Sequence, residues 1–189
     1  MLDKPVGERQ RMRARLRLSL VIAVLLLVLA ACHPSDENRA AQEMVLAEFT
    51  ESYVNVSITL EHIEAGEAVL EATFTPTEPD AHLYSMQLPK DGIDGLGRPT
   101  LIELPLGEGM RVAGELQESQ PSQEDSVASD LPSLPVYPAG PVTLSLAVTL
   151  PEGSGLVNDQ VIITYMACTP RGCHKPVMGK LVDVQVPTK

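Results

Sequence analysis

The sequence predicts an all-β fold, a sandwich or barrel of antiparallel strands, and three observations support this prediction. Several short segments alternate apolar and polar residues, which is the period of a strand with one buried face. The chain holds 13 Gly and 16 Pro, which indicate turns between these segments and argue against a helical bundle. Aromatic residues make up 3% of the chain, so Val, Leu and Ile must build the core. The solvated face of each strand favours antiparallel over parallel pairing.

The individual strands are predicted from alternation and from runs of β-branched residues. Strands are expected at residues 54–60, 68–74, 83–88, 100–104, 142–150, 161–166 and 181–186. Residues 89–99 contain three Gly and two Pro and predict a loop. Residues 44–49 are expected to form one or two helical turns or to join a preceding tether. Residues 117–134 are acidic and rich in Ser and Pro, which predicts either a mobile loop or a lid.

The N-terminus is interpreted as a targeting segment rather than as part of the fold. Arg9–Arg17 is strongly basic, and the apolar run that follows at residues 18–31 is shorter than the roughly 20 residues of a membrane-spanning helix. The run ends in Leu29-Ala30-Ala31-Cys32, which resembles the bacterial lipoprotein signal. This resemblance implies cleavage before Cys32 and attachment of lipid, including palmitate, to it. Because His33 rather than Asp follows, the sorting rule of Gram-negative lipoproteins implies the outer membrane.

Three segments are therefore expected: a signal peptide at residues 1–31, a lipidated Cys32 with a flexible tether at 32–52, and one β domain at 53–189. An uncleaved N-terminal anchor is the alternative, and it also places the domain outside the inner membrane, in the bacterial periplasm. The formal net charge is −11, and residues 32–189 are more acidic still, because residues 1–31 hold six of the 14 Lys and Arg but only two of the 25 Asp and Glu. This balance excludes a nucleic-acid binder and a polybasic membrane-surface module.

Cys168 and Cys173 remain once Cys32 is assigned to lipid, and they lie in the sequence YMACTPRGCHKP. Pro170 and Gly172 between them favour a chain reversal, so the two cysteines can face each other across a hairpin. A disulfide needs Cα atoms about 5.5–6 Å apart, a separation that opposed residues approach. The oxidising compartment permits this bond.

The residues alone leave open whether this pair is structural or redox-active. A disulfide that closes a short loop contributes the least stability, which favours a chemical role. Arg171 and His174 are expected beside the sulfurs, where positive charge favours the nucleophilic thiolate. Exchange would then proceed through a mixed disulfide with a partner thiol.

The segment from Thr164 to Pro176 resembles the N-terminal periplasmic domain of the DsbD thiol:disulfide interchange proteins, with T-Y-x-x-C, a short spacer and C-x-x-P. Residues 82–85 resemble the Y-L-Y segment of that family, and the loop at 89–99 resembles the stretch after that segment. Residues 137–148 resemble the strand that leads into the cysteine hairpin. His82 stands where the best-known members have Tyr, and residues 117–135 lack the aromatic residue of the family's cap loop.

The resemblance implies an immunoglobulin-like antiparallel β-sandwich whose cysteine pair relays electrons. It implies that Cys173 engages the client, that Cys168 is the resolving cysteine, and that Tyr84 lies near the pair. Arg171 and His174 would tune the thiols, and Pro176 would shape the strand after the turn. The expected partners are thioredoxin-like or disulfide-isomerase-like periplasmic proteins and a separate transmembrane reductant. No cofactor is expected, because the dithiol carries two electrons itself.

Two other functions stay open at this point. A copper(I)-handling lipoprotein is suggested by soft ligands that gather near the cysteines, although Met178 is expected in the core. These residues are Met166, Cys168, Cys173, His174 and Met178. A structural or adaptor lipoprotein with a purely structural disulfide is the other alternative. No metal site is assigned, and the sequence contains no nucleotide-binding or serine-hydrolase motif.

Overall fold

The computed structural model describes residues 43–107, 109–125 and 133–189, which make up the β domain. Within these ranges the chain forms strands, turns and irregular segments, and no helix there is long and apolar enough to cross a membrane. The predicted signal segment, Cys32 and the tether up to residue 42 lie outside the described residues.

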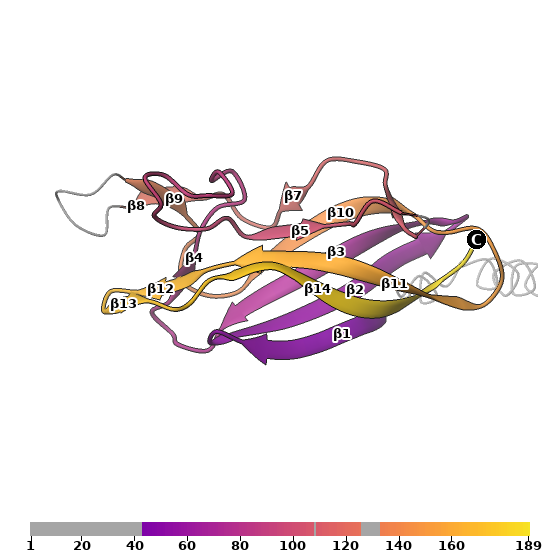
Figure 1. Ribbon diagram of the computed structural model, residues 1–189, viewed down its shortest axis with the longest axis horizontal. Helices are drawn as coiled ribbons and strands as arrows, with labels where there is room; N and C mark the ends of the chain where they lie inside the picture. The colour runs from indigo at the N-terminus through magenta and orange to yellow at the C-terminus, as the bar shows by residue number, and fades with distance from the viewer. Residues whose placement is uncertain (1–42, 108, 126–132) are drawn as a thin grey trace, which may run out of the picture. The chain divides into compact units, whose positions relative to one another are not determined.

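The larger of two main sheets is six-stranded and antiparallel, with the order β1-β2-β3-β10-β6 and with β7 also paired to β10 (Figure 1). Its strands are β1 (Met44–Glu51), β2 (Val54–Glu64), β3 (Glu67–Pro76), β6 (Arg111–Val112), β7 (Gln117–Glu118) and β10 (Val142–Thr149). β1 pairs with β2 and β2 pairs with β3, so these three strands are neighbours both in the sequence and in the sheet. β10 pairs with the other edge of β3.

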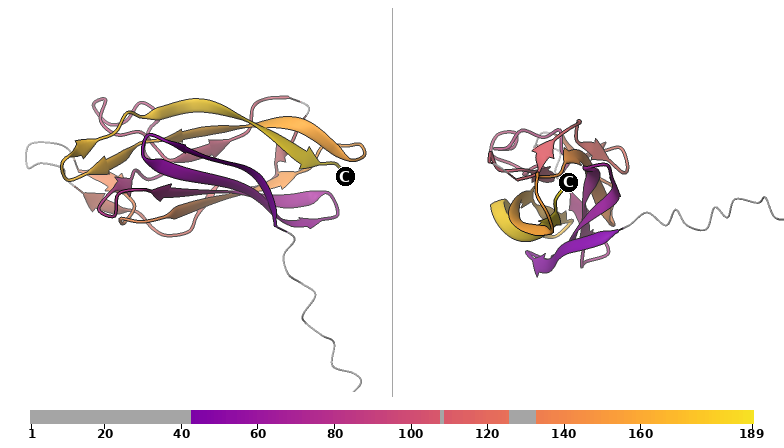
Figure 2. Two further views of the ribbon diagram at one scale, coloured as in Figure 1. Left: turned by 90° about the horizontal axis from the view of Figure 1, so that it is seen from below. Right: turned by 90° about the vertical axis from the view of Figure 1, so that its right-hand side faces the viewer.

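The second main sheet has three antiparallel strands in the order β14-β11-β5. They are β5 (Leu101–Glu103), β11 (Leu156–Tyr165) and β14 (Val177–Pro187). The two sheets face each other as the two layers of a sandwich (Figure 2), and buried residues from both form one apolar core. The prediction of an immunoglobulin-like antiparallel β-sandwich is confirmed.

Two small sheets lie at the end of the sandwich where β11 ends (Figure 1). One contains β4 (His82–Leu83), β12 (Ala167–Thr169) and β13 (Gly172–Cys173) in the order β13-β12-β4. The other pairs β8 (Gln123–Asp125) with β9 (Leu134–Val136). These small sheets bring distant parts of the sequence to one end of the molecule.

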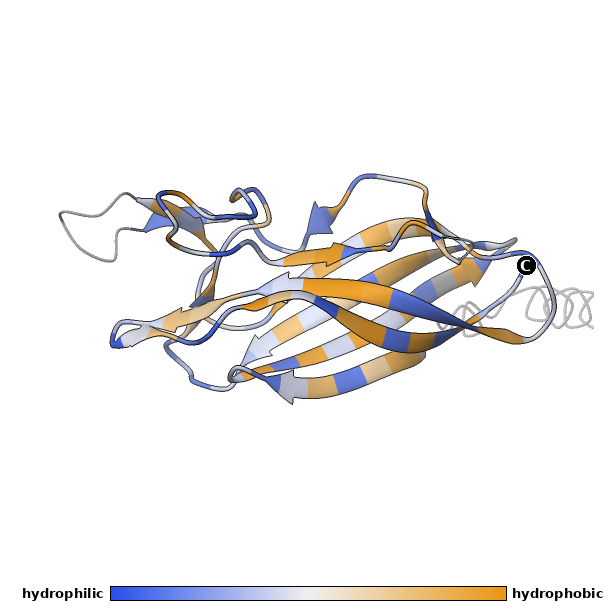
Figure 3. Ribbon diagram, in the orientation of Figure 1, coloured by the Kyte–Doolittle hydropathy of each residue, from blue (hydrophilic) through white to orange (hydrophobic). Residues whose placement is uncertain are grey.

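Alternation along the strands explains the core. Every second residue of β3 is buried, from Ala68 to Pro76, and β10 shows the same period over most of its length. Bands of apolar and polar residues follow one another along the strands (Figure 3). The scarce aromatic residues add one contact, in which the rings of Phe74 and Tyr165 meet edge to face with centroids 5.5 Å apart. The Tyr165 hydroxyl donates to the Glu51 carbonyl at 2.9 Å, which joins the second sheet to the end of β1.

The strands expected at 54–60, 68–74, 100–104, 142–150, 161–166 and 181–186 are confirmed, as is the loop at 89–99. Two expectations are wrong. Residues 44–49 form neither helical turns nor tether but most of β1, which pairs with β2, so the sandwich starts at Met44 rather than at Tyr53. The strand expected at 83–88 is reduced to β4, because turns follow Tyr84.

A buried leucine and an exposed leucine provide a matched test of this core. Leu70 is fully buried in β3, whereas Leu181 in β14 is 55% exposed. Leu70→Ala should lower the free energy of unfolding by about 2–5 kcal/mol, because it removes buried methyl groups and leaves a cavity. Leu181→Ala should change it by about 0.5 kcal/mol or less. Urea denaturation measures both, and equal losses would contradict the assigned inward face of β3.

Candidate functional site

Cys168 and Cys173 face each other across the hairpin of β12 and β13 and form a disulfide. The His174 amide donates to the Ala167 carbonyl at 2.9 Å, so the next pair along the hairpin is hydrogen-bonded and the cysteines form a non-hydrogen-bonded pair. Side chains are closer in such pairs, and the Cα atoms lie 3.9 Å apart rather than at the expected 5.5–6 Å. The predicted disulfide-forming pair is therefore present in the folded chain.

A β-bulge interrupts the pairing of β11 with β14 shortly before the cysteine hairpin. The pairing of β11 with β14 shifts by one residue between Ile163 and Tyr165. Opposite this shift, Gly179 has a φ of 59°, a left-handed conformation that glycine adopts without a Cβ clash. Its amide donates to the Thr164 hydroxyl at 3.0 Å, which holds the bulge in place. Bulges commonly redirect side chains near functional sites, and here one lies just before the cysteine hairpin.

The two sulfurs have different environments. Cys168 is 1% exposed and belongs to a small apolar cluster that is separate from the main core. We call this group the cysteine cluster; its buried members are Tyr84, Leu88, Leu134, Val136 and Cys168. Cys173 lies at the tip of the hairpin and is exposed. A macromolecular partner can therefore reach Cys173 in this conformation but not Cys168.

The Tyr84 hydroxyl lies 3.2 Å from the sulfur of Cys168 and 3.8 Å from that of Cys173. Thr100 holds this segment, since its amide and hydroxyl both donate to the Tyr84 carbonyl, at 3.1 and 2.7 Å. Burial raises the pKa of Tyr84, and the charge of Asp125 raises it further. The hydroxyl is therefore protonated near neutral pH and can donate a hydrogen bond to a thiolate.

His82 lies on the other side of Cys168, because the two residues are partners in the pairing of β4 with β12. Its ring meets that of Tyr84 edge to face, with centroids 5.7 Å apart. The His82 Nε2 atom is buried and has no hydrogen-bond partner among the described residues. Burial lowers the pKa of His82, while the charge of Asp125 acts in the opposite direction. Sequence reasoning noted His82 only as a departure from a family pattern.

The two basic residues expected beside the sulfurs make ion pairs with acidic side chains. His174 Nε2 lies 2.6 Å from a carboxylate oxygen of Glu78, and Arg171 lies 3.5 Å from the other oxygen. Arg171 also approaches Asp80 at 3.9 Å, and the Tyr53 ring stacks on His174 with centroids 4.2 Å apart. The positive charge of Arg171 is thus partly neutralised by Glu78 and Asp80. Sequence reasoning missed these acidic partners because they are distant in sequence.

Pro176 lies in the irregular connection between β13 and β14. Proline has no amide hydrogen, so this connection is a position that tolerates it better than a central strand would. That Pro176 shapes the strand after the turn stays a prediction.

The residues that suggested copper do not all gather at the cysteines. Met166 packs against the cysteine cluster, but His174 binds Glu78. The expectation that Met178 lies in the core is wrong, since its side chain is 53% exposed on β14. In the part of the chain that the structure describes, no group of three or more His, Cys, Asp and Glu side chains could hold a metal ion.

The acidic segment expected at 117–134 contributes to the site through its described ends. The Ser85 amide donates to the Pro135 carbonyl, and the Tyr137 amide to the Leu83 carbonyl, which fixes β9 beside the Tyr84 segment. Leu134 and Val136 of β9 thereby enter the cysteine cluster. Cys168 is thus covered partly by aliphatic side chains. Residues 126–132 lie outside the described residues.

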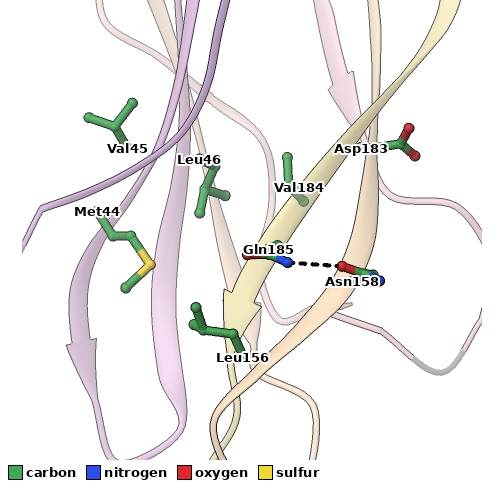
Figure 4. Close-up of a pocket in the computed structure, with 8 residues that line it drawn as sticks. All are labelled: Met44, Val45, Leu46, Leu156, Asn158, Asp183, Val184 and Gln185. Atoms are coloured by element: carbon green, nitrogen blue, oxygen red, sulfur yellow. Dashed lines mark hydrogen bonds between the residues drawn. The ribbon is translucent and has the colours of Figure 1, made fainter.

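A cleft at the opposite end of β11 holds none of the predicted site residues (Figure 4). It has a volume of about 730 Å³ and lies between β1 and the β11–β14 pair. Its lining residues are Met44, Val45, Leu46, Leu156, Asn158, Asp183, Val184 and Gln185. Its polar side chains include Gln185, which donates to Asn158 at 3.2 Å. This cleft contains no cysteine and none of the predicted site residues, so the cysteine hairpin is the candidate functional site.

The fold and the site define a class: an immunoglobulin-like β-sandwich with a disulfide at the tip of a hairpin. No protein-family model and no curated protein matches the chain. Among solved structures, the crystal structure of the Neisseria meningitidis DsbD N-terminal domain in the reduced form is similar, with 11% sequence identity and a TM-score of 0.37. The match covers 84% of this chain and 90% of that chain.

The hydrogen bond from Tyr84 to Cys168 gives a test of the site. In the reduced protein, Tyr84→Phe should raise the pKa of the Cys168 thiol by about one to two units, because a hydrogen bond to a charged group contributes roughly 1.5–3 kcal/mol. Titration of the ¹³C shift of the cysteine Cβ atoms measures this pKa. Tyr53→Phe is the matched control, since it removes an exposed hydroxyl near the same hairpin. An unchanged Cys168 pKa in Tyr84→Phe would show that the hydroxyl does not stabilise the thiolate.

Proposed function

We propose that this protein exchanges disulfides with partner thiols, with Cys173 as the cysteine that engages the partner and Cys168 as the resolving cysteine. The observation that carries the proposal is the contrast in exposure between two sulfurs joined by one bond. Cys173 is exposed at a hairpin tip, whereas Cys168 is 1% exposed. Exchange through a mixed disulfide requires one accessible sulfur and one sulfur that is held close but protected from other thiols.

A purely structural role fits this disulfide less well. The chain-entropy model gives roughly 2 kcal/mol for a loop this short, against about 4.7 kcal/mol for a loop of about 100 residues. The bond joins residues separated by five positions, and β12 and β13 are already paired there. Neither cysteine belongs to the main core. The disulfide therefore adds little to the stability of a hairpin that strand pairing already holds together.

The exchange balances in two steps. A thiolate of a reduced partner attacks the Cys173 sulfur, and the Cys168–Cys173 bond breaks. Its electron pair leaves with Cys168 as a thiolate, which the Tyr84 hydroxyl stabilises from 3.2 Å. A second partner thiol then attacks the mixed disulfide, so the partner leaves oxidised and this protein retains two thiols. The reverse sequence passes the two electrons to a disulfide-bonded client.

We also propose the setting of this exchange. The resemblance of Thr164–Pro176 to the DsbD family makes thioredoxin-like and disulfide-isomerase-like proteins the partners to test first, with a separate transmembrane reductant as the electron source. The lipoprotein-like signal that ends at Cys32 supports a periplasmic protein anchored by lipid, in the outer membrane on the sorting rule.

The reduction potential of the Cys168–Cys173 pair tests the proposed exchange. The full chain carrying Cys32→Ser is equilibrated with glutathione or dithiothreitol buffers, and its free thiols are counted. A potential between roughly −120 and −270 mV, the range of exchange proteins, is expected. A potential below about −300 mV would identify a structural bond and would favour the adaptor function instead.

Two single-cysteine variants separate the roles of the sulfurs in the same experiment. With oxidised glutathione, Cys168→Ala should form a mixed disulfide at Cys173 at least about tenfold faster than Cys173→Ala forms one at Cys168, because access limits exchange. Mass spectrometry of quenched samples measures both rates. Equal rates would contradict the assignment of Cys173 as the engaging residue.

Lipid attachment is tested in a Gram-negative host fed with labelled palmitate. The full chain should incorporate the label and sediment with membranes, whereas Cys32→Ser should do neither, because the acyl chains are attached through that residue. Cys173→Ser serves as the matched control and should remain labelled. Label that persists in Cys32→Ser would contradict lipidation at this position.

A further inference from the structure

Three residues form a row across the small sheet at the end of the sandwich. Cys168 in the middle strand is the register partner of Cys173 on one side and of His82 on the other. Directly opposed residues point to the same face of a sheet, with Cβ atoms about 4.5–5.5 Å apart. The imidazole of His82 therefore leaves the same face of the small sheet as the buried sulfur, on the side away from the disulfide, and in the disulfide form its Nε2 atom makes no hydrogen bond to that sulfur.

The Nε2 atom of His82 is buried without a hydrogen-bond partner among the described residues. Buried polar atoms are nearly always paired, so an unpaired one in a folded chain calls for a reason. In the tautomer with its proton on Nδ1, Nε2 carries a free lone pair and can accept a proton. Burial lowers the pKa of His82 and so favours this neutral form.

We propose that His82 is the general base that accepts the proton of the Cys168 thiol when Cys168 resolves a mixed disulfide. This inference deepens the proposed exchange and rests on it. It assigns a catalytic role to a residue whose Nε2 atom has no hydrogen-bond partner among the described residues. The chemical need is clear, because Cys168 is buried and no bulk water reaches its thiol directly.

Atoms and electrons balance in this step. The starting species has Cys173 bonded to a client sulfur and Cys168 as a thiol. The Cys168 proton passes to His82 Nε2, and the resulting thiolate attacks the Cys173 sulfur. A Cys168–Cys173 bond forms, the Cys173–client bond breaks, and the client leaves as a thiolate with the electron pair. The client is reduced, and the imidazolium then returns its proton to the leaving thiolate or to water.

The other groups around His82 suit this role less well. Just after β4, Tyr84 has a raised pKa and is a proton donor to sulfur rather than a base. From β8, Asp125 is exposed, and its negative charge favours the imidazolium that the step creates. On the hairpin, His174 and Arg171 are already paired with Glu78. Among the described residues, His82 is therefore the base best placed for Cys168.

The test follows the two thiols separately in the reduced full chain carrying Cys32→Ser. One equivalent of 5,5′-dithiobis(2-nitrobenzoate) reacts at Cys173 and releases one thionitrobenzoate; resolution by Cys168 then releases a second. Stopped-flow absorbance resolves the two phases. In His82→Asn, the second phase should be about 100-fold slower at pH 7, the lower end of what a general base contributes, while the first phase keeps its rate. His82→Gln repeats the test if the first variant does not fold.

The pH profile distinguishes a base from a merely structural residue. In the parent protein, the rate of the second phase should rise with pH and level off below about 8.5, the ordinary pKa of a thiol. In His82→Asn, the rate should instead keep rising up to the pKa of the thiol itself. Identical profiles, or equal slowing of both phases, would overturn the role of His82 and leave the exchange intact. A parent protein that never releases the second thionitrobenzoate would overturn the exchange itself.

Discussion

The pairing of β11 with β14 is the constraint on which the site depends. These strands form one long hairpin, and the cysteines occupy its tip beyond the sandwich. Side chains alternate between faces, so a slip of one residue would turn a side chain to the opposite face. The bulge between Thr164 and Gly179 provides a one-residue shift before the tip is reached. The main core thus fixes the position of a disulfide that lies outside it.

The tip combines two environments that a single strand could not provide. One side of the disulfide is open to solvent at Cys173, and the other is enclosed by the cysteine cluster around Cys168. The enclosing residues come from the segment that follows β4 and from β9, which are held together by backbone hydrogen bonds on both sides of Tyr84. A buried thiolate is costly without a donor, and the Tyr84 hydroxyl is positioned to supply one. The accessible and the protected sulfur are therefore the two ends of one bond.

Local patterns predicted much of this structure, and long-range contacts account for most of what they missed. Alternation from Val54 onward identified the central strands, and Pro170 with Gly172 predicted the reversal that opposes the cysteines. The same reasoning failed for β1, whose MVLAEFTE sequence becomes a strand through its pairing with β2. It also could not assign the ion pair of His174 with Glu78, because 96 residues separate them. The sequence also could not predict that the Nε2 atom of His82 is buried without a hydrogen-bond partner, because this depends on how distant segments pack.

The first strand, β1, begins at the end of the sandwich that lies opposite the cysteines. Met44 lies at the cleft beside Leu156, where β11 begins, whereas the cysteines lie just beyond the other end of β11. A strand of ten residues spans about 33 Å, so the chain joins the sandwich far from its disulfide. A domain held by the chain that precedes Met44 would be held at the pole opposite its cysteines. The end that carries the cysteines would then be the one free to meet macromolecules approaching from the surrounding space.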